Sequence, residues 1–188
     1  VKWTWRHKKS GSTRSFQKDF ITSLRQDLQG KSLTVTDVHK SAKKTYSPGL
    51  YDLTELQRDA NQKFGYSAKE TLNIMQRLYE NHKVLTYPRT DSRYIGTDVV
   101  PTIKERLKAC NQGPYKAYIP ALLRSEIRPN RSFVDDKKVS DHHAIIPTEE
   151  AAIFSNMTNE ERKIYDLVVR RFLSVLYPPF EYEQTSPK

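Results

Sequence analysis

The sequence predicts an α+β fold in which a helical domain is inserted into a β-rich domain. Two kinds of pattern support this prediction. Polar and apolar residues alternate at 32–39 and again at 180–185, as they do in half-buried strands. Between these segments, apolar residues recur every three or four positions behind Ser/Thr-x-x-Glu/Gln pairs that can cap helices. Because the last alternating segment has no neighbouring partner, we expect it to pair with the β-rich start of the chain.

The β-rich part is expected at both ends of the chain. In its first strand Leu33 and Val35 fall on one face, and the cluster Ser47-Pro48-Gly49 then closes the segment as a turn. The expected boundaries are 1–53 for part of the β-rich domain, 54–177 for the helical domain and 178–188 for an incomplete return strand.

Three helices are predicted by paired capping residues. In each pair the hydroxyl can accept from a backbone N–H three positions on, and the longer side chain can reach back. Gly65 and Pro178-Pro179 mark the ends of the first and the last helix. Two more helices are expected at about 98–109 and 115–123. The pairs are Thr54 with Gln57, Ser67 with Glu70, and Thr158 with Glu161, and the second helix carries Leu72, Met75, Leu78 and Tyr79 at helical spacing.

The charge of the chain indicates a polyanionic partner. Charged residues make up 29% of the 188 residues, and the formal net charge is +10. Residues 1–50 contain eleven Lys and Arg against three Asp, which accounts for +8 of that charge. We therefore expect nucleic acid ahead of an anionic membrane surface. A solvated basic face would show the same pattern, so this alternative stays open.

Cysteine content and hydropathy indicate the cellular compartment in which the protein works. Cys110 is the only cysteine, which excludes an internal disulfide and argues against a zinc site built from thiolates. This fits a reducing compartment, and we expect a cytoplasmic location. No apolar stretch approaches the roughly 20 residues that span a bilayer, so we expect no membrane partner. The first residues, VKWTWR, are neither a signal peptide nor a natural translation start, so we expect an excised piece.

The segment LTYPRTDSRYI, residues 85–95, concentrates groups that can act on a phosphate. A phenol, with an ordinary pKa near 10, becomes a nucleophile when a cation stabilises the phenolate and another group takes the proton. Tyr87 and Arg89 can point the same way from an extended segment, so Arg89 can clamp the phosphate that Tyr87 attacks. Thr90 and Ser92 can hold the flanking phosphate or orient Arg89. A core strand running into a polar turn explains the left half equally well, so a structural tyrosine stays open.

A second group of polar residues is SDHHAIIPT, residues 140–148. Adjacent histidines point to opposite sides of an extended segment, so only one of His142 and His143 faces a given site. Such a histidine can donate to a phosphate oxygen or carry a proton near neutral pH. A surface-loop pair, or a core histidine bound to a backbone carbonyl, remains an alternative. A metal needs more ligands than the pair supplies, so we expect no metal site, and Asp135-Asp136 is expected to mark a turn.

Together these segments resemble the type IA DNA topoisomerases. LTYPRTDSRYI resembles the family's T-Y-x-R-[TS]-D-[SC] pattern around the active-site tyrosine. SDHHAIIPT resembles the family's H-[HE]-A-I-x-P-T segment, which follows the tyrosine by about the distance seen here. The stretches at 50–80 and 162–185 resemble the helical approach to the active site and the return to the β domain. Pro88 and the His-His pair resemble the bacterial topoisomerase III branch more than the topoisomerase I branch.

The resemblance implies a role for each motif. Tyr87 corresponds to the nucleophile that forms a 5′-phosphotyrosine with one cleaved strand. Arg89 corresponds to the arginine that holds the scissile phosphate, and His142 to the active-site histidine. The implied fold is a helical, catabolite-activator-like domain inserted into a partial β-rich arch domain. The implied function is ATP-independent cleavage and religation of one strand, which permits strand passage, relaxation and decatenation. The residues expected to bind DNA are Thr90, Ser92, Arg93 and His143.

The resemblance also implies a part that this sequence does not contain. In the family, an amino-terminal domain supplies the acidic cluster that holds magnesium, and these residues contain no substitute cluster. We therefore expect magnesium in the complete enzyme but not in this chain, and the missing amino-terminal domain as a partner. On this view the chain holds the nucleophile and cannot relax DNA alone. Two alternatives remain: a non-catalytic module that binds single-stranded DNA, and a scaffold that only completes a ring and meets partner proteins.

Overall fold

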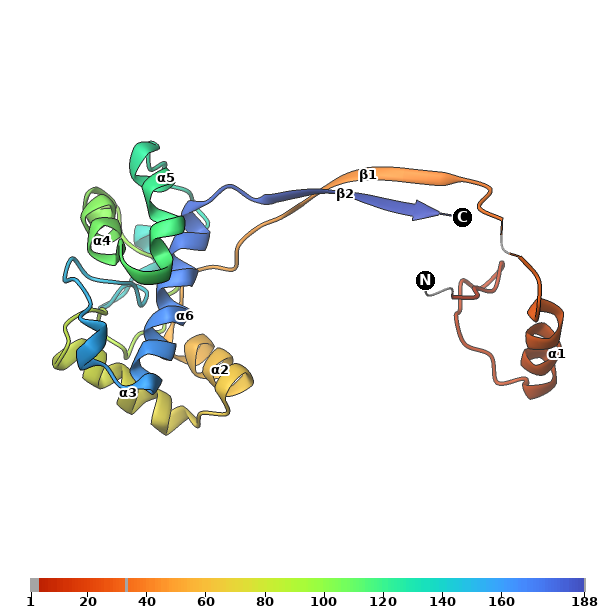
Figure 1. Ribbon diagram of the computed structural model, residues 1–188, viewed down its shortest axis with the longest axis horizontal. Helices are drawn as coiled ribbons and strands as arrows, with labels where there is room; N and C mark the ends of the chain where they lie inside the picture. The colour runs from red at the N-terminus through yellow and green to blue at the C-terminus, as the bar shows by residue number, and fades with distance from the viewer. Residues whose placement is uncertain (1–3, 33, 188) are drawn as a thin grey trace. The chain divides into compact units, whose positions relative to one another are not determined.

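The computed structural model describes residues 4–32 and 34–187, and Figure 1 shows its helices and strands. The chain divides into two compact units, one made of Val1–Lys43 with Glu183–Lys188 and the other of Lys44–Tyr182. Helices dominate, and the described residues contain one small sheet, so the predicted α+β class is confirmed at this level. Among the described residues, no helix is both long enough and apolar enough to cross a bilayer.

The first unit departs from the β-rich prediction for residues 1–53. A helix, α1, occupies Lys18–Leu28 instead. Its sequence KDFITSLRQDL spaces apolar residues for a helix, and Asp19 in the first turn and Arg25 in the last complement the helix dipole. The strand expected at 32–39 begins only at Val38. Leu33 lies outside the described residues.

The sheet consists of β1, Val38–Thr45, paired with β2, Phe180–Pro187. Lys40 pairs with Glu183 at 3.0 Å and Lys44 with Glu181 at 2.6 Å. Because the residue numbers rise on one strand as they fall on the other, the two strands are antiparallel. The predicted pairing of the carboxyl-terminal segment with the start of the chain is therefore confirmed.

The second unit begins with α2, Leu53–Phe64. The predicted cap of Thr54 with Gln57 is wrong, because the carboxylate of Asp52 accepts the Glu55 N–H at 2.6 Å and caps the helix two positions earlier. The predicted end is confirmed: Gly65 adopts φ 73°, the left-handed conformation that glycine reaches without steric cost.

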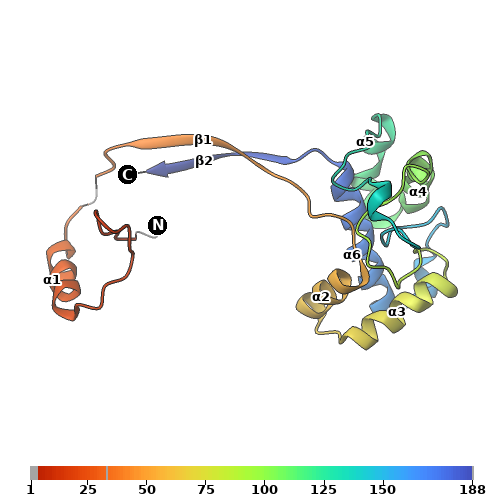
Figure 2. The same cartoon turned by 180° about the vertical axis from the view of Figure 1, so that it is seen from behind.

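The other two predicted capping boxes are confirmed. Ser67 and Glu70 open α3, Ala68–Glu80, and Thr158 opens α6, Asn159–Leu176. Figures 1 and 2 show α6 running from α3 at its start to α5 at its end, with α2 beside it. Each large apolar side chain that α6 buries stabilises the fold by about 1.5–3 kcal/mol. Those side chains are Ile164, Tyr165, Leu167, Val168, Val169, Phe172 and Leu173.

Short helices complete the second unit. The helix expected at 98–109 starts later, as a 3-10 turn followed by α4, because residues 97–99 form a turn. The helix expected at 115–123 is likewise a 3-10 turn followed by α5. The elements are η1 (Val100–Thr102), α4 (Ile103–Cys110), η2 (Gly113–Ala117), α5 (Ile119–Arg124), η3 (Asp136–Lys138) and η4 (Phe154–Asn156).

A buried carboxylate joins α3 to the start of α6. Glu161 is 3% exposed and accepts hydrogen bonds from Arg77 Nε at 2.7 Å and from the Thr158 N–H at 2.9 Å. His82 Nε2 lies 3.2 Å from its second oxygen. Burial alone would raise the pKa of Glu161, but these hydrogen bonds and nearby charges lower it below its ordinary value. The ion pair fixes the end of α3 against α6.

We predict that Glu161→Gln lowers the free energy of unfolding by about 1–3 kcal/mol at pH 7, the usual contribution of a hydrogen bond to a charged group. Glutamine can still close the capping box, so the loss reports the carboxylate's partners. Because the folded state lowers this pKa, the contribution is present above the ordinary value of 4.5 and is lost as pH falls through the lowered pKa. Chemical denaturation at several pH values measures both effects.

The matched control is Glu160→Gln, which removes the same charge from the neighbouring exposed position. Equal losses in the two variants would show that net charge, and not the buried pair, carries the effect. A difference between wild type and Glu161→Gln that did not shrink in acid would contradict the assignment of the pH dependence to this carboxylate.

Candidate active site

The two motif segments, far apart in sequence, lie side by side in the second unit. Leu85 and Pro147 form an antiparallel bridge, and the Thr86 N–H donates to the Ile146 carbonyl at 3.0 Å. The Thr86 hydroxyl donates to the Ala144 carbonyl at 3.2 Å and accepts from the Ile146 N–H at 3.0 Å. The backbone that carries the tyrosine is therefore tied to the backbone that carries the histidines.

This pairing brings Tyr87 and His142 into contact. Their ring centroids are 4.3 Å apart, with an angle of 39° between the planes. Tyr87 is half-buried and His142 is exposed. Both line a hollow of about 220 Å³, together with Thr86, Asp98, Asp141 and His143. The phenol and an imidazole thus share one small cavity that solvent can enter.

Arg89 lies beside the same histidine. Its side chain is exposed, and it lines a neighbouring hollow of about 400 Å³ with His142, Asp91 and Ser140. His142 therefore belongs to both hollows and connects the one that contains Tyr87 with the one that contains Arg89. The structure brings together all three residues that were predicted to be catalytic.

Thr90 and Ser92 face inward. Thr90 is 8% exposed, and its hydroxyl donates to the His142 carbonyl at 3.0 Å and accepts from the Ser92 N–H at 3.1 Å. The Ser92 side chain, 5% exposed, donates to the Lys138 carbonyl at 2.7 Å. Both hydroxyls thus hold the loop together, and a direct contact of either with DNA stays a prediction.

The remaining two residues predicted to bind DNA are half-buried. Arg93 Nε donates to the Leu50 carbonyl at 3.2 Å. His143 Nδ1 lies 2.7 Å from the Ala144 carbonyl, so this nitrogen is the donor. His143 nevertheless lines the same hollow as His142, so the prediction that only one of the two histidines faces a given site is wrong. The contacts of Arg93 and His143 with DNA also stay predictions.

Asp135 and Asp136 hold the turn at η3, as predicted from the sequence. Asp136 accepts from the N–H and the hydroxyl of Thr97, at 2.7 and 2.9 Å, and Asp135 caps η3. A Cβ on Gly96 would meet the Asp98 carboxylate, so that exposed side chain would have to move to admit a larger residue. Within residues 4–32 and 34–187, no three His, Cys, Asp or Glu side chains gather closely enough to hold a metal ion.

Sequence reasoning missed one aromatic neighbour of the tyrosine. Tyr79, in the last turn of α3, lies 5.4 Å from the Tyr87 ring with the planes at 80°. Its spacing placed it among the apolar residues of the helix, but it is 37% exposed. Its position eight residues before Tyr87 gave no signal, because the distance between the two rings depends on the turn between them.

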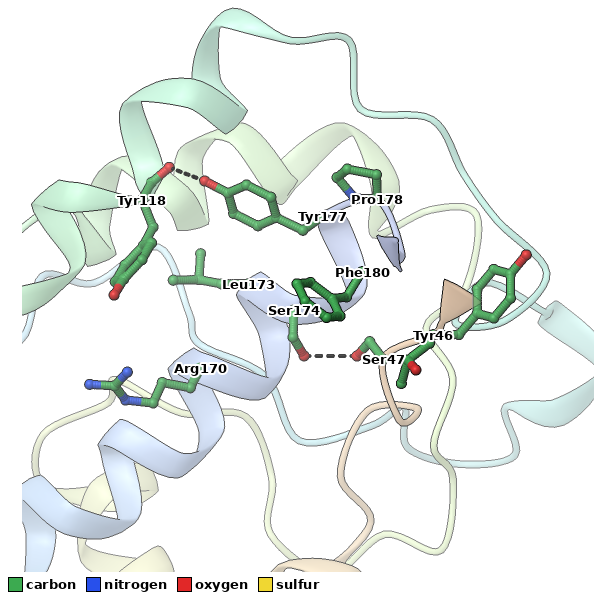
Figure 3. Close-up of a pocket in the computed structure, with 10 residues that line it drawn as sticks. Tyr46, Ser47, Tyr118, Arg170, Leu173, Ser174, Tyr177, Pro178 and Phe180 are labelled. Carbon is green, nitrogen blue, oxygen red and sulfur yellow. Dashed lines mark hydrogen bonds between the residues drawn. The ribbon is translucent and has the colours of Figure 1, made fainter. Parts of the chain in front are cut away.

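A separate aromatic pocket lies away from the motif segments. It has a volume of about 490 Å³ and lies where α6 ends, and the Tyr177 hydroxyl donates to the Tyr118 carbonyl at 2.7 Å beside it (Figure 3). The hydroxyls of Ser47 and Ser174 are 2.8 Å apart at its edge. Neither Tyr87, Arg89 nor His142 lines this pocket, so it is distinct from the candidate site.

The fold and this arrangement define a class of protein. The family model described as DNA topoisomerase matches residues 2–188, and the chain therefore belongs to that family. The chain is 63% identical over 184 residues to DNA topoisomerase 3 of Bacillus cereus (strain ATCC 14579), covering 98% of this chain and 25% of the relative. It is 53% identical over 182 residues to DNA topoisomerase 3 of Bacillus subtilis (strain 168), covering 97% and 25%.

A solved structure agrees with these matches. The structure of full-length topoisomerase I from Thermotoga maritima superposes with a TM-score of 0.61 and 25% sequence identity, covering 88% of this chain and 26% of that one. The chain thus spans about a quarter of the length of the relatives it matches. The resemblance to type IA DNA topoisomerases, and to their topoisomerase III branch, is confirmed.

We predict that Thr90→Val lowers the free energy of unfolding by about 1–3 kcal/mol, because valine keeps the shape but leaves the Ser92 N–H and the His142 carbonyl without this partner. Thr90→Ser is the control, since it keeps the hydroxyl. Thermal or chemical unfolding measures the loss. Unchanged stability together with weakened DNA binding would instead make Thr90 a direct DNA contact.

Proposed function

We propose that this chain is the tyrosine-carrying part of a type IA DNA topoisomerase of the topoisomerase III kind. The main support for this proposal is the contact between the Tyr87 and His142 rings, whose centroids are 4.3 Å apart. Arg89 lines a hollow that His142 also lines. A phenol and an imidazole in one solvent-accessible hollow, with a guanidinium in the neighbouring hollow that the imidazole also lines, are groups that can attack a phosphodiester.

In the proposed reaction, the Tyr87 oxygen attacks the scissile phosphorus. The new bond joins this oxygen to phosphorus, and the bond from phosphorus to the 3′ oxygen breaks. The phenol proton passes to the solvent or to a general base, and the departing 3′ oxygen takes up a proton from the solvent or from a general acid. The strand then carries a 5′-phosphotyrosine on one side and a free 3′ hydroxyl on the other. Attack by that hydroxyl reverses the step. Because the phosphodiester is exchanged and not hydrolysed, religation needs no ATP.

The neighbouring side chains have separable roles in this proposal. Arg89, exposed and planar, binds the phosphate oxygens and neutralises the charge that develops in the transition state. His142 contacts the ring of the nucleophile and can donate to the phosphate or carry the proton. Thr90 and Ser92 support the site by holding the loop in place, since both residues are buried.

The activity of a whole enzyme is also part of the proposal. Relaxation and decatenation by single-strand passage are proposed from the family and from the names of the relatives. From the family we also propose that magnesium, and an amino-terminal domain that would hold it, act together with this chain in the complete enzyme. A cytoplasmic location stays a prediction.

We further propose a domain assignment. The helices α2 to α6 correspond to the helical domain that carries the tyrosine, and β1 and β2 to the strands that connect it with the arch domain. The compact units support a division of this kind, although they divide the chain after Lys43 and after Tyr182. The boundaries at 53 and 177 stay predictions.

We predict that Tyr87→Phe in the complete enzyme abolishes the covalent adduct with single-stranded DNA, because phenylalanine lacks the attacking oxygen. Binding of the same oligonucleotide should change less than twofold. The adduct is detected by denaturing electrophoresis of a labelled oligonucleotide. An adduct that survives the substitution would refute the nucleophile assignment. Absence of any adduct in the wild-type enzyme would favour the alternative of a non-catalytic single-stranded DNA-binding module.

We predict that Arg89→Ala slows adduct formation by about 10²–10³-fold, the usual cost of removing one donor that stabilises a transition state, while DNA affinity falls much less. Arg89→Lys is the matched variant: it keeps the charge and loses the planar fork, so partial activity is expected. Single-turnover cleavage and equilibrium binding separate the two effects. Equal losses in rate and affinity would reduce Arg89 to a binding residue.

A further inference from the structure

The ring of Tyr87 is contacted from two sides by aromatic side chains. His142, from the second motif segment, lies against it with the ring centroids 4.3 Å apart. Tyr79 contacts it at 5.4 Å with an angle of 80°, an edge-to-face arrangement that aromatic pairs favour. Tyr79 belongs to neither motif segment. It is 37% exposed, so its burial in the core does not account for its position.

The backbone next to the nucleophile is already fixed, but its ring is not. The N–H and the hydroxyl of Thr86 hold the adjacent peptide against Ala144 and Ile146. What remains free is rotation about the side-chain bonds of Tyr87, which swings the phenol oxygen through several ångströms. A reacting oxygen must be held about 3–3.5 Å from its target, so the contacts of the ring decide how often it is in place.

The hollows around the Tyr87 ring leave room for this side-chain rotation. One hollow beside Tyr87, of about 220 Å³, contains His142, and a second, of about 540 Å³, is lined by Tyr79, Lys83 and Thr148. If the Tyr79 ring were removed, the second hollow would grow on the side toward Tyr87. The nucleophile would then be free to turn away from His142.

Tyr79 is itself held on a rigid support. Two positions earlier, Arg77 pairs with the buried Glu161, and the Val84 N–H donates to the Leu78 carbonyl at 3.0 Å. The Lys83 carbonyl accepts from the Thr148 hydroxyl at 2.6 Å. These bonds fix the backbone that carries Tyr79 relative to both motif segments, so the residue is held next to Tyr87.

We propose that Tyr79 is a positioning residue, whose ring packs at a steep angle against the Tyr87 ring and keeps the phenol oriented for attack beside His142. The proposal rests on the proposed function. The ring acts through its contact with Tyr87 and not through its own hydroxyl, so phenylalanine at this position should serve equally well.

The test compares Tyr79→Leu with Tyr79→Phe in the complete enzyme, using a labelled single-stranded oligonucleotide. Tyr79→Leu keeps an apolar side chain but loses the aromatic ring, and we expect adduct formation to slow about tenfold, with the dissociation constant unchanged within twofold. Tyr79→Phe should retain both values. Tyr46→Leu is the matched control, since Tyr46 is 70% exposed in the separate pocket of Figure 3 and should leave the rate unchanged.

Three results would overturn the proposal. An unchanged rate in Tyr79→Leu would show that the contact does not matter, and a loss of affinity that matches the loss of rate would make Tyr79 a DNA contact. An equal loss in Tyr79→Phe would assign the effect to the hydroxyl. Melting temperatures of all variants exclude unfolding as the cause. The Tyr87→Phe variant separates this inference from the proposed function. If the wild-type enzyme forms no adduct, the proposed function is wrong. If the adduct depends on Tyr87 but Tyr79→Leu forms it at the normal rate, only this inference is wrong.

Discussion

The candidate site depends on the pairing between the segment that carries Tyr87 and the segment that carries His142. The pairing is made by main-chain hydrogen bonds and by two threonine hydroxyls, at positions separated by more than fifty residues. Burying these polar groups is favourable only when each finds its partner, so the two segments hold one register. Without that register Tyr87 and His142 would belong to unrelated loops.

In the segment around Tyr87, buried hydroxyls and exposed charged groups have different roles. Thr90 and Ser92 use their hydroxyls to hold the loop, and the adjacent Arg89 is left exposed. Arg106 fixes the far end of the histidine segment, because its buried guanidinium donates to the Pro147 carbonyl at 2.7 Å. The frame is thus satisfied internally, and the groups at the surface remain available to a phosphate.

The helices contribute by holding this frame from outside. Glu161 joins the end of α3 to the start of α6, and Arg171 of α6 pairs with Asp59 of α2 at 2.8 Å. The same guanidinium lies over the Tyr51 ring, and Tyr51 forms a bridge with Ile145 of the histidine segment. The ion pair between α6 and α2 is therefore linked to the histidine segment through Tyr51. The end of α3 places Tyr79 next to Tyr87.

The sequence by itself determined the features that depend on local chemistry. The capping boxes at Ser67 and Thr158, the glycine stop at Gly65 and the motifs around Tyr87 and His142 were readable, because each rests on neighbouring residues. Tertiary structure decided the rest. Asp52 and not Thr54 caps α2, a helix forms at Lys18–Leu28 within the part expected to be β-rich, and Thr90 turns inward. Competing local signals and long-range contacts settle such outcomes, and the contact of Tyr79 with Tyr87 exists only once the chain has folded.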